Sequence, residues 1–104
     1  LNLKKDFKWM AAGKKLETKY LKLFVKLGDN QTPKVGIAVS SKTFTKATER
    51  NRVRRITSAA FEALYENFPQ NINILALPKS QVINVKSGDV LLDLEERLRR
   101  EKIL

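Results

Sequence analysis

The residues whose types and spacing best suit chemistry are four arginines within six positions, in the segment Arg50-Asn51-Arg52-Val53-Arg54-Arg55. Guanidinium groups make paired, charge-assisted hydrogen bonds with phosphate oxygens, and the free N–H groups at a helix start add positive potential. The run therefore predicts contact with a nucleic-acid backbone, although it contains no base-reading pattern. The predicted contacts are Lys42, Lys46, Arg50, Asn51, Arg52, Arg54 and Arg55.

A solvated basic face is the ordinary alternative, because most charge runs contact only water. Glu49 and Glu62 would then neutralise part of the charge along the helix. Four arginines in six residues without an interleaved acid favour nucleic-acid contact over this alternative.

A second candidate site is the segment from Lys19 to Leu27, where residue types alternate as in a strand. Its apolar face carries four residues, Leu21, Leu23, Val25 and Leu27. The opposite face carries Tyr20, Lys22, Phe24 and Lys26. Aromatic rings that stack bases beside lysines that meet phosphates are typical of a surface for single-stranded nucleic acid. Helix packing over this face is the alternative, and for Phe24 the two interpretations are equally supported.

The composition points the same way. Lys and Arg number 21 against 11 Asp and Glu, which gives a net charge of +10 and a pI near 10.1. Such an imbalance predicts a polyanionic partner, and nucleic acid fits better than a membrane surface because no amphipathic helix gathers the basic residues. The sequence has neither His nor Cys, which excludes the usual nucleophile systems and transition-metal sites. We therefore predict no catalytic residues and no protein metal site.

The elements that position these residues follow from periodicity and breakers. We predict a helix over 4–12, followed by strands over 19–27 and 35–39 that pair as a hairpin. A helix over 46–68 then directs Val53 and Ile56 into the core. A strand over 72–77 and a last helix with Ser87 as its N-cap complete the chain. This α-β-β-α-β-α order indicates an α+β fold, a two-layer sandwich with helices packed on one face of a small mixed sheet. We expect residues 1–104 to form one domain.

The chain also lacks the signals of a membrane or secreted protein. No apolar run approaches the roughly 20 residues that span a bilayer, and no signal peptide begins at Leu1. We expect a cytoplasmic protein, and the missing initiator Met suggests a trimmed or partial amino terminus.

The stretch from Lys34 to Phe61 resembles the protein subunit of bacterial ribonuclease P. The matched features are a Val-Gly-hydrophobic strand running into Val39-Ser40, Lys42, Ala47, the Arg50-Asn51-Arg52 signature, the basic pair Arg54-Arg55, and Phe61. Weaker similarity extends to Lys4-Lys5-Asp6-Phe7 and to residues 73–76.

The resemblance implies a protein that assists a catalytic RNA in removing the 5′ leader of precursor tRNA by Mg²⁺-dependent hydrolysis. Mg²⁺ would be held mainly by the RNA and the substrate, and no obligate protein partner is evident. The arginine-rich helix would face the catalytic RNA, and a left-handed crossover would place it on the sheet. The implied leader-binding cleft comprises Phe7, Tyr20, Lys22, Phe24 and Ser40.

Two departures from the family pattern lie near the arginines. Ser41 replaces a frequent second lysine, and Ser58-Ala59 replace a charged pair. Other classes also fit a basic helix: a ribosome-associated RNA-binding protein without processing activity, or a DNA-binding protein using residues 50–61 as a recognition helix. The roles of Val53 and Ile56 in the core disfavour a helix free to enter a DNA groove.

Overall fold

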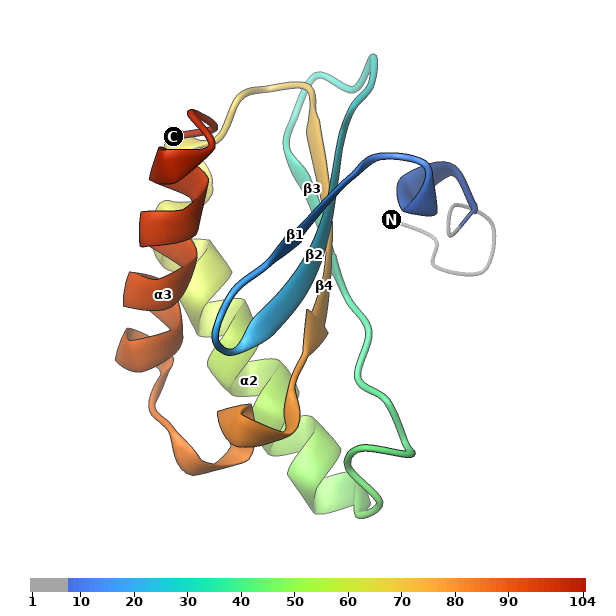
Figure 1. The fold of residues 1–104 in the computed structure, drawn as a ribbon, viewed down its shortest axis with the longest axis vertical. Coiled ribbons are helices and arrows are strands. Elements are labelled where there is room, and N and C mark those ends of the chain that lie inside the picture. Colours follow the sequence, from blue (N-terminus) through green and yellow to red (C-terminus); the bar gives the residue numbers. More distant parts are fainter. Residues whose placement is uncertain (1–7) are drawn as a thin grey trace.

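A computed structural model describes residues 8–104, in which a four-stranded mixed sheet carries two long helices on one face (Figure 1). A short helical turn at 8–11 lies on the other side of the sheet. The elements in chain order are β1 (Lys14–Glu17), β2 (Leu21–Leu27), β3 (Lys34–Ile37), α2 (Ala47–Leu64), a 3-10 turn at Tyr65–Asn67, β4 (Ile72–Pro78), a 3-10 turn at Ser80–Asn84 and α3 (Ser87–Arg100). The predicted α+β sandwich is confirmed.

The last strand in the sequence lies inside the sheet, whose order is β1-β2-β4-β3. β4 pairs antiparallel with the whole of β2, from Leu21 opposite Pro78 to Leu27 opposite Ile72, and parallel with β3. The chain passes from β3 through α2 to β4, and this crossover is left-handed (Figure 1). The handedness is the reverse of the general rule for such units. It agrees with the expectation from the family resemblance.

α2 forms because residues 47–64 contain no Gly or Pro and present apolar side chains at helical spacing. Its buried residues are Val53, Thr57, Ala60, Phe61 and Leu64. The helix tightens into the 3-10 turn that precedes Pro69, which cannot continue it. This helix therefore presents one face to the sheet and leaves the other, with the arginines, to solvent.

The hydrophobic core lies between the sheet and the two helices. Leu21 and Leu23 of β2 contribute to it from the sheet, and Val90, Leu94 and Leu98 contribute from α3. All five side chains are fully buried. A Leu, Ile or Val side chain buried in this way stabilises the fold by roughly 1.5–3 kcal/mol. The core fixes α2 against the sheet and so fixes the direction of its outer face.

A different set of residues faces away from the helices. Phe24 lies opposite Leu75 in the β2–β4 register, and Leu75 lies opposite Gly36 of β3. Met10 and Leu75 are buried but do not belong to the main core. We call this side, with Lys22, Phe24 and the residues paired to them, the outer sheet face.

Three details of the sequence prediction need correction. β2 and β3 do not form a hairpin, because β4 lies between them. β1 was not predicted, since Leu16 is its single buried residue and gives no readable alternation. The N-cap of α3 is Lys86 rather than Ser87, with the Lys86 backbone N–H donating to the Asp89 carboxylate at 3.0 Å. Of the helix predicted over 4–12, residues 4–7 lie outside the described residues.

Candidate nucleic-acid interface

The start of α2 carries the arginines, and the first of them is tied to the loop that precedes the helix. The Nη1 atom of Arg50 donates to the carbonyl oxygens of Phe44 at 2.9 Å and Thr45 at 3.0 Å. Phe44 is itself buried in the core with 2% of its surface exposed. Arg50 is half-buried, so it holds the β3–α2 loop against the helix and leaves less of its guanidinium for a ligand.

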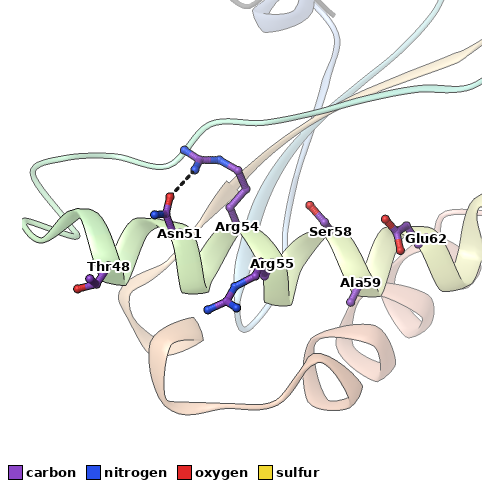
Figure 2. Close-up of a pocket in the computed structure, with 7 residues that line it drawn as sticks. All are labelled: Thr48, Asn51, Arg54, Arg55, Ser58, Ala59 and Glu62. Atoms are coloured by element: carbon purple, nitrogen blue, oxygen red, sulfur yellow. Dashed lines mark hydrogen bonds between the residues drawn. The ribbon is translucent and has the colours of Figure 1, made fainter.

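The next residues of the run point outward. Asn51 and Arg54 are exposed, and Arg54 Nη1 donates to Asn51 Oδ1 at 3.3 Å (Figure 2). Asn51 therefore orients Arg54 within the exposed face. Arg52 reaches in another direction, where its Nε donates to the carbonyl oxygen of Ile83 at 3.3 Å. Arg55 is exposed as well.

A shallow hollow runs along the exposed side of α2, and we call it the α2 groove. Its volume is about 770 Å³. The residues that line it are Thr48, Asn51, Arg54, Arg55, Ser58, Ala59 and Glu62 (Figure 2). Arg54 and Arg55 project from the helix in different directions, while Ser58 and Ala59 are short and leave space between the arginines and Glu62 (Figure 2). The small pair noted in the sequence thus lines the groove.

A second hollow of about 480 Å³ lies where α2 meets the segment leading into α3, and we call it the α2–α3 groove. It is lined by Arg52, Arg55, Ile56, Ala59, Val85, Lys86 and Ser87. Arg52 and Arg55 line it together, as expected from their adjacent positions around the helix.

The charges of the arginine run are free of acidic partners. Within residues 8–104 there are five ion pairs, and their acidic partners are Glu17, Glu95, Glu96 and Glu101. The basic partners lie in β1, directly after β4 and in α3. None of these pairs involves Arg50, Arg52, Arg54 or Arg55. A hydrogen bond from Lys14 lowers the pKa of the Glu101 carboxyl, and one from Lys79 lowers the pKa of the Glu17 carboxyl. The positive potential at the start of α2 is therefore not cancelled by the acids that these pairs engage.

The lysines and the serine ahead of α2 lie in the exposed loop. Lys42 and Lys46 are exposed, and Lys46 donates its backbone N–H to Glu49 Oε1 at 3.3 Å as the helix begins. Ser40 is also exposed, but its hydroxyl oxygen accepts the backbone N–H groups of Lys42 and Thr43, which shapes the turn. The structure thus groups both lysines with the arginines and gives Ser40 a turn-forming role.

The predicted aromatic surface is only partly assembled. Lys22 is exposed and Phe24 is half-buried on the outer sheet face, as expected. Tyr20 precedes β2 and packs against the hydrophobic core, and its backbone N–H donates to Asp93 of α3 at 3.1 Å. The prediction that Tyr20 shares a face with Phe24 is therefore not supported by its packing. Phe7 lies outside the described residues.

Sequence reasoning missed two contributors to these surfaces. Phe44 anchors the loop that Arg50 closes, and its only signal was an apolar side chain isolated between polar ones. Lys86 reaches the α2–α3 groove from another part of the chain, and its only signal was a basic residue next to a helix start.

Neither a metal-ligand cluster nor a membrane span is found in the described part of the chain. Among residues 8–104, no three His, Cys, Asp or Glu side chains gather as metal ligands would. The helices within the same residues are all too short or too polar to cross a bilayer.

Comparison with known proteins places the chain in one family. The ribonuclease P family model matches residues 1–102, so the chain belongs to the ribonuclease P protein family. A ribonuclease P protein component from Pseudoalteromonas atlantica is 32% identical over 76 residues, which is 73% of this chain and 62% of that protein. One from Syntrophus aciditrophicus is 28% identical over 89 residues, 86% of this chain and 74% of that protein.

Solved structures agree on the fold. The RNase P protein from Thermotoga maritima aligns with a TM-score of 0.83 and 26% identity, covering 96% of this chain and 97% of its own. The Staphylococcus aureus RNase P protein, at 17% identity, aligns with a TM-score of 0.81. The chain spans about 62% of the length of the P. atlantica relative.

Proposed function

We propose that this chain is the protein subunit of a ribonuclease P, which binds the catalytic RNA through the start of α2 and assists removal of the 5′ leader of precursor tRNA. The observation that carries the proposal is the α2 groove, in which Arg54 and Arg55 are exposed and form no ion pair with a residue of the described chain. Arginines held on a rigid helix without acidic partners suit phosphate oxygens. The family membership supplies the identity of the RNA.

The protein contributes binding rather than bond cleavage in this proposal. Arg54, oriented by Asn51, and Arg55 bind phosphates of the catalytic RNA, and Lys42 and Lys46 extend the contact from the loop. Arg52 adds a charge at the neighbouring groove. These cations relieve phosphate repulsion, so the complex needs less Mg²⁺ to fold and to hold substrate.

Bound Mg²⁺ would supply the hydrolytic chemistry as a Lewis acid. We propose that RNA and substrate oxygens hold it, because the side chains at the α2 groove that carry full charge are mainly arginines, which repel a cation. The single carboxylate there, Glu62, is one ligand at most.

We further propose that the outer sheet face receives the leader. Phe24 offers a partly exposed ring for base stacking, and Lys22 is the neighbouring cation for a phosphate. Ser40 contributes through the turn that it stabilises. Tyr20 is left out of this surface because it packs against the core.

The test is 5′-leader cleavage of a precursor tRNA by a bacterial ribonuclease P RNA at low Mg²⁺, with and without the protein. The wild-type protein is expected to stimulate cleavage. The double variant Arg54→Ala/Arg55→Ala is expected to lose most of the stimulation and to reduce the salt dependence of RNA binding by about 0.7–0.9 in slope for each lost phosphate contact.

A double variant on α3, Arg99→Ala/Arg100→Ala, is the matched control, since it removes the same charge from residues already paired with Glu95 and Glu96. Its stimulation should stay close to wild type. Tight, salt-sensitive RNA binding without any stimulation would contradict the proposal and leave a general RNA-binding protein.

A further inference from the structure

The α2–α3 groove combines cations and apolar surface from two parts of the chain. Arg52 and Arg55 come from α2, and Lys86 comes from the segment that leads into α3. The hydrogen bond from Arg52 Nε to the Ile83 carbonyl ties the arginine to that segment. Within residues 8–104, none of these three cations forms an ion pair.

The floor of the groove is apolar, with Ile56 and Val85 both half-buried. Cations around an apolar floor match the two parts of a nucleotide, because the phosphate meets the charges while the sugar or base covers the apolar surface. Asp89 is the acidic residue at this helix start, and its carboxylate accepts the Lys86 backbone N–H at 3.0 Å. The Asp89 carboxylate therefore caps the helix and forms no ion pair with the Lys86 ammonium group.

The α2 groove and the α2–α3 groove have lining residues in common, which indicates that both bind the same kind of ligand. Arg55 and Ala59 line both the α2 groove and the α2–α3 groove. A strand bound to Arg54 and Arg55 can therefore continue past Ala59 to Lys86 without leaving the protein surface. An acidic peptide would satisfy the cations too, but it would not account for this continuity with the proposed RNA site.

We propose that the α2–α3 groove is a second RNA-backbone site, with Lys86 as a phosphate contact and Ile56 and Val85 as the apolar floor. The inference rests on the proposed function, since the RNA is the one bound at the start of α2. It extends the interface from one helix to the junction of two.

The first test compares Lys86→Gln with Lys102→Gln in titrations of the ribonuclease P RNA at several salt concentrations. Both lysines are exposed, and the two variants lose the same charge. Lys86→Gln is expected to weaken binding and to reduce the salt slope by about 1, as expected for one phosphate contact. Lys102→Gln is expected to leave the slope at its wild-type value. Equal slopes for Lys86→Gln and wild type would overturn the inference.

The second test locates the RNA directly. Since the sequence has no cysteine, Ser87→Cys and Leu92→Cys each give one attachment point for a photo-activated cross-linker. Ser87 lines the groove, whereas Leu92 is 67% exposed elsewhere on α3. Cross-linking to the RNA is expected from position 87 and not from position 92. Cross-links of equal yield, or none from position 87, would contradict the site.

The proposed function and the second RNA-backbone site can be rejected separately. If the wild-type protein neither bound nor stimulated the ribonuclease P RNA, both the proposed function and this inference would be overturned. If Arg54→Ala/Arg55→Ala weakened binding while Lys86→Gln had no effect, the proposed function would stand and the second site would be rejected.

Discussion

The four arginines of the run have different surroundings although the sequence presents them as equivalent. Arg50 bonds two loop carbonyls, Arg52 bonds a carbonyl across the α2–α3 groove, and Arg54 is oriented by Asn51. Arg55 lines both grooves. The first arginine is thus mainly structural, and the later ones are available to a ligand.

This difference predicts unequal effects of two alanine substitutions on the free energy of unfolding. Arg50→Ala removes charge-assisted hydrogen bonds to the Phe44 and Thr45 carbonyls, so we expect a loss of about 1.5–3 kcal/mol in the free energy of unfolding. Arg55→Ala, on the exposed surface, should change it by less than about 0.5 kcal/mol. Urea denaturation measures both.

The same two variants should also differ in RNA binding, but in another way than in stability. Arg55→Ala is expected to lower the salt slope of binding, while Arg50→Ala should lower affinity through the loop with a smaller change in slope. Equal stability of Arg50→Ala and wild type would show that the loop does not depend on this side chain.

At this scale the sequence was sufficient to predict an exposed basic run, because helical geometry alone separates Val53 from the arginines. It was not sufficient to predict that Arg50 turns back to the loop, since that depends on where the chain places Phe44. Tyr20 shows the same limit: alternation assigned it to the outer sheet face, but it lies before β2 and packs against the core.

Among the elements, the strands show what alternation does and does not determine. It correctly predicted that Leu21, Leu23 and Val25 are buried, since each side chain of a strand faces away from its neighbour in sequence. Leu27, the last residue of the predicted apolar face, is 60% exposed, because it lies at the end of β2. It does not identify neighbouring strands, and the predicted β2–β3 hairpin was wrong for that reason. The apolar run over residues 74–77 of β4 was the available signal, because a strand buried on both faces belongs inside a sheet.

The contact between the amino-terminal segment and β2 depends on a glycine. A Cβ atom on Gly13 would lie 2.6 Å from the Val25 carbonyl oxygen and 2.9 Å from Lys26 Cβ. Gly13→Ala therefore forces residues 8–12 away from β2, and we expect a loss of about 1–3 kcal/mol in unfolding free energy. Trp9, the single tryptophan, lies with its ring centroid 4.5 Å from Lys26 Nζ and should report the shift in its fluorescence.

The matched control is Gly88→Ala in the first turn of α3, where nothing lies within 4 Å of an added Cβ. This variant should be as stable as wild type or more stable by about 0.4–1 kcal/mol, because alanine restricts the unfolded chain. Unchanged fluorescence and stability in Gly13→Ala would mean that the segment adjusts without cost.

Considered as a whole, the molecule separates its paired charges from its unpaired ones. The ion pairs of the described residues lie on α3, on β1 and at the end of β4, including Lys14 with Glu101 and Lys79 with Glu17. The start of α2 keeps its positive charge. Arginines that form no ion pair within the described residues therefore gather where the RNA is proposed to bind.

The paired carboxylates make stability depend on acid pH. The pKa values of Glu17 and Glu101 are lowered from 4.5 because Lys79 and Lys14 donate hydrogen bonds to them. A lowered pKa in the folded state stabilises the fold fully above about pH 4.5, and the stabilisation is lost as pH falls through the folded value. Urea denaturation should show the free energy of unfolding decreasing as pH falls from about 6 to about 3.

Glu101→Gln serves as the control, since it has no carboxyl to protonate and should show a shallower decrease. High salt should reduce the contribution of these surface pairs. Protonation of the 11 acidic residues also raises the net charge toward +21, which adds repulsion in the same direction. Stability independent of pH below 4.5 would contradict this account.

The position of β4 has a consequence for how the protein is made. The strand that joins β2 to β3 is synthesised after both of them and after α2. Until it leaves the ribosome, β1 and β2 form at most a two-stranded ribbon, which is marginally stable in water, and β3 has no partner. The arginine helix then has no complete sheet to pack on. Folding is therefore expected to complete only after β4 has been synthesised, and the basic surface becomes ordered together with the core.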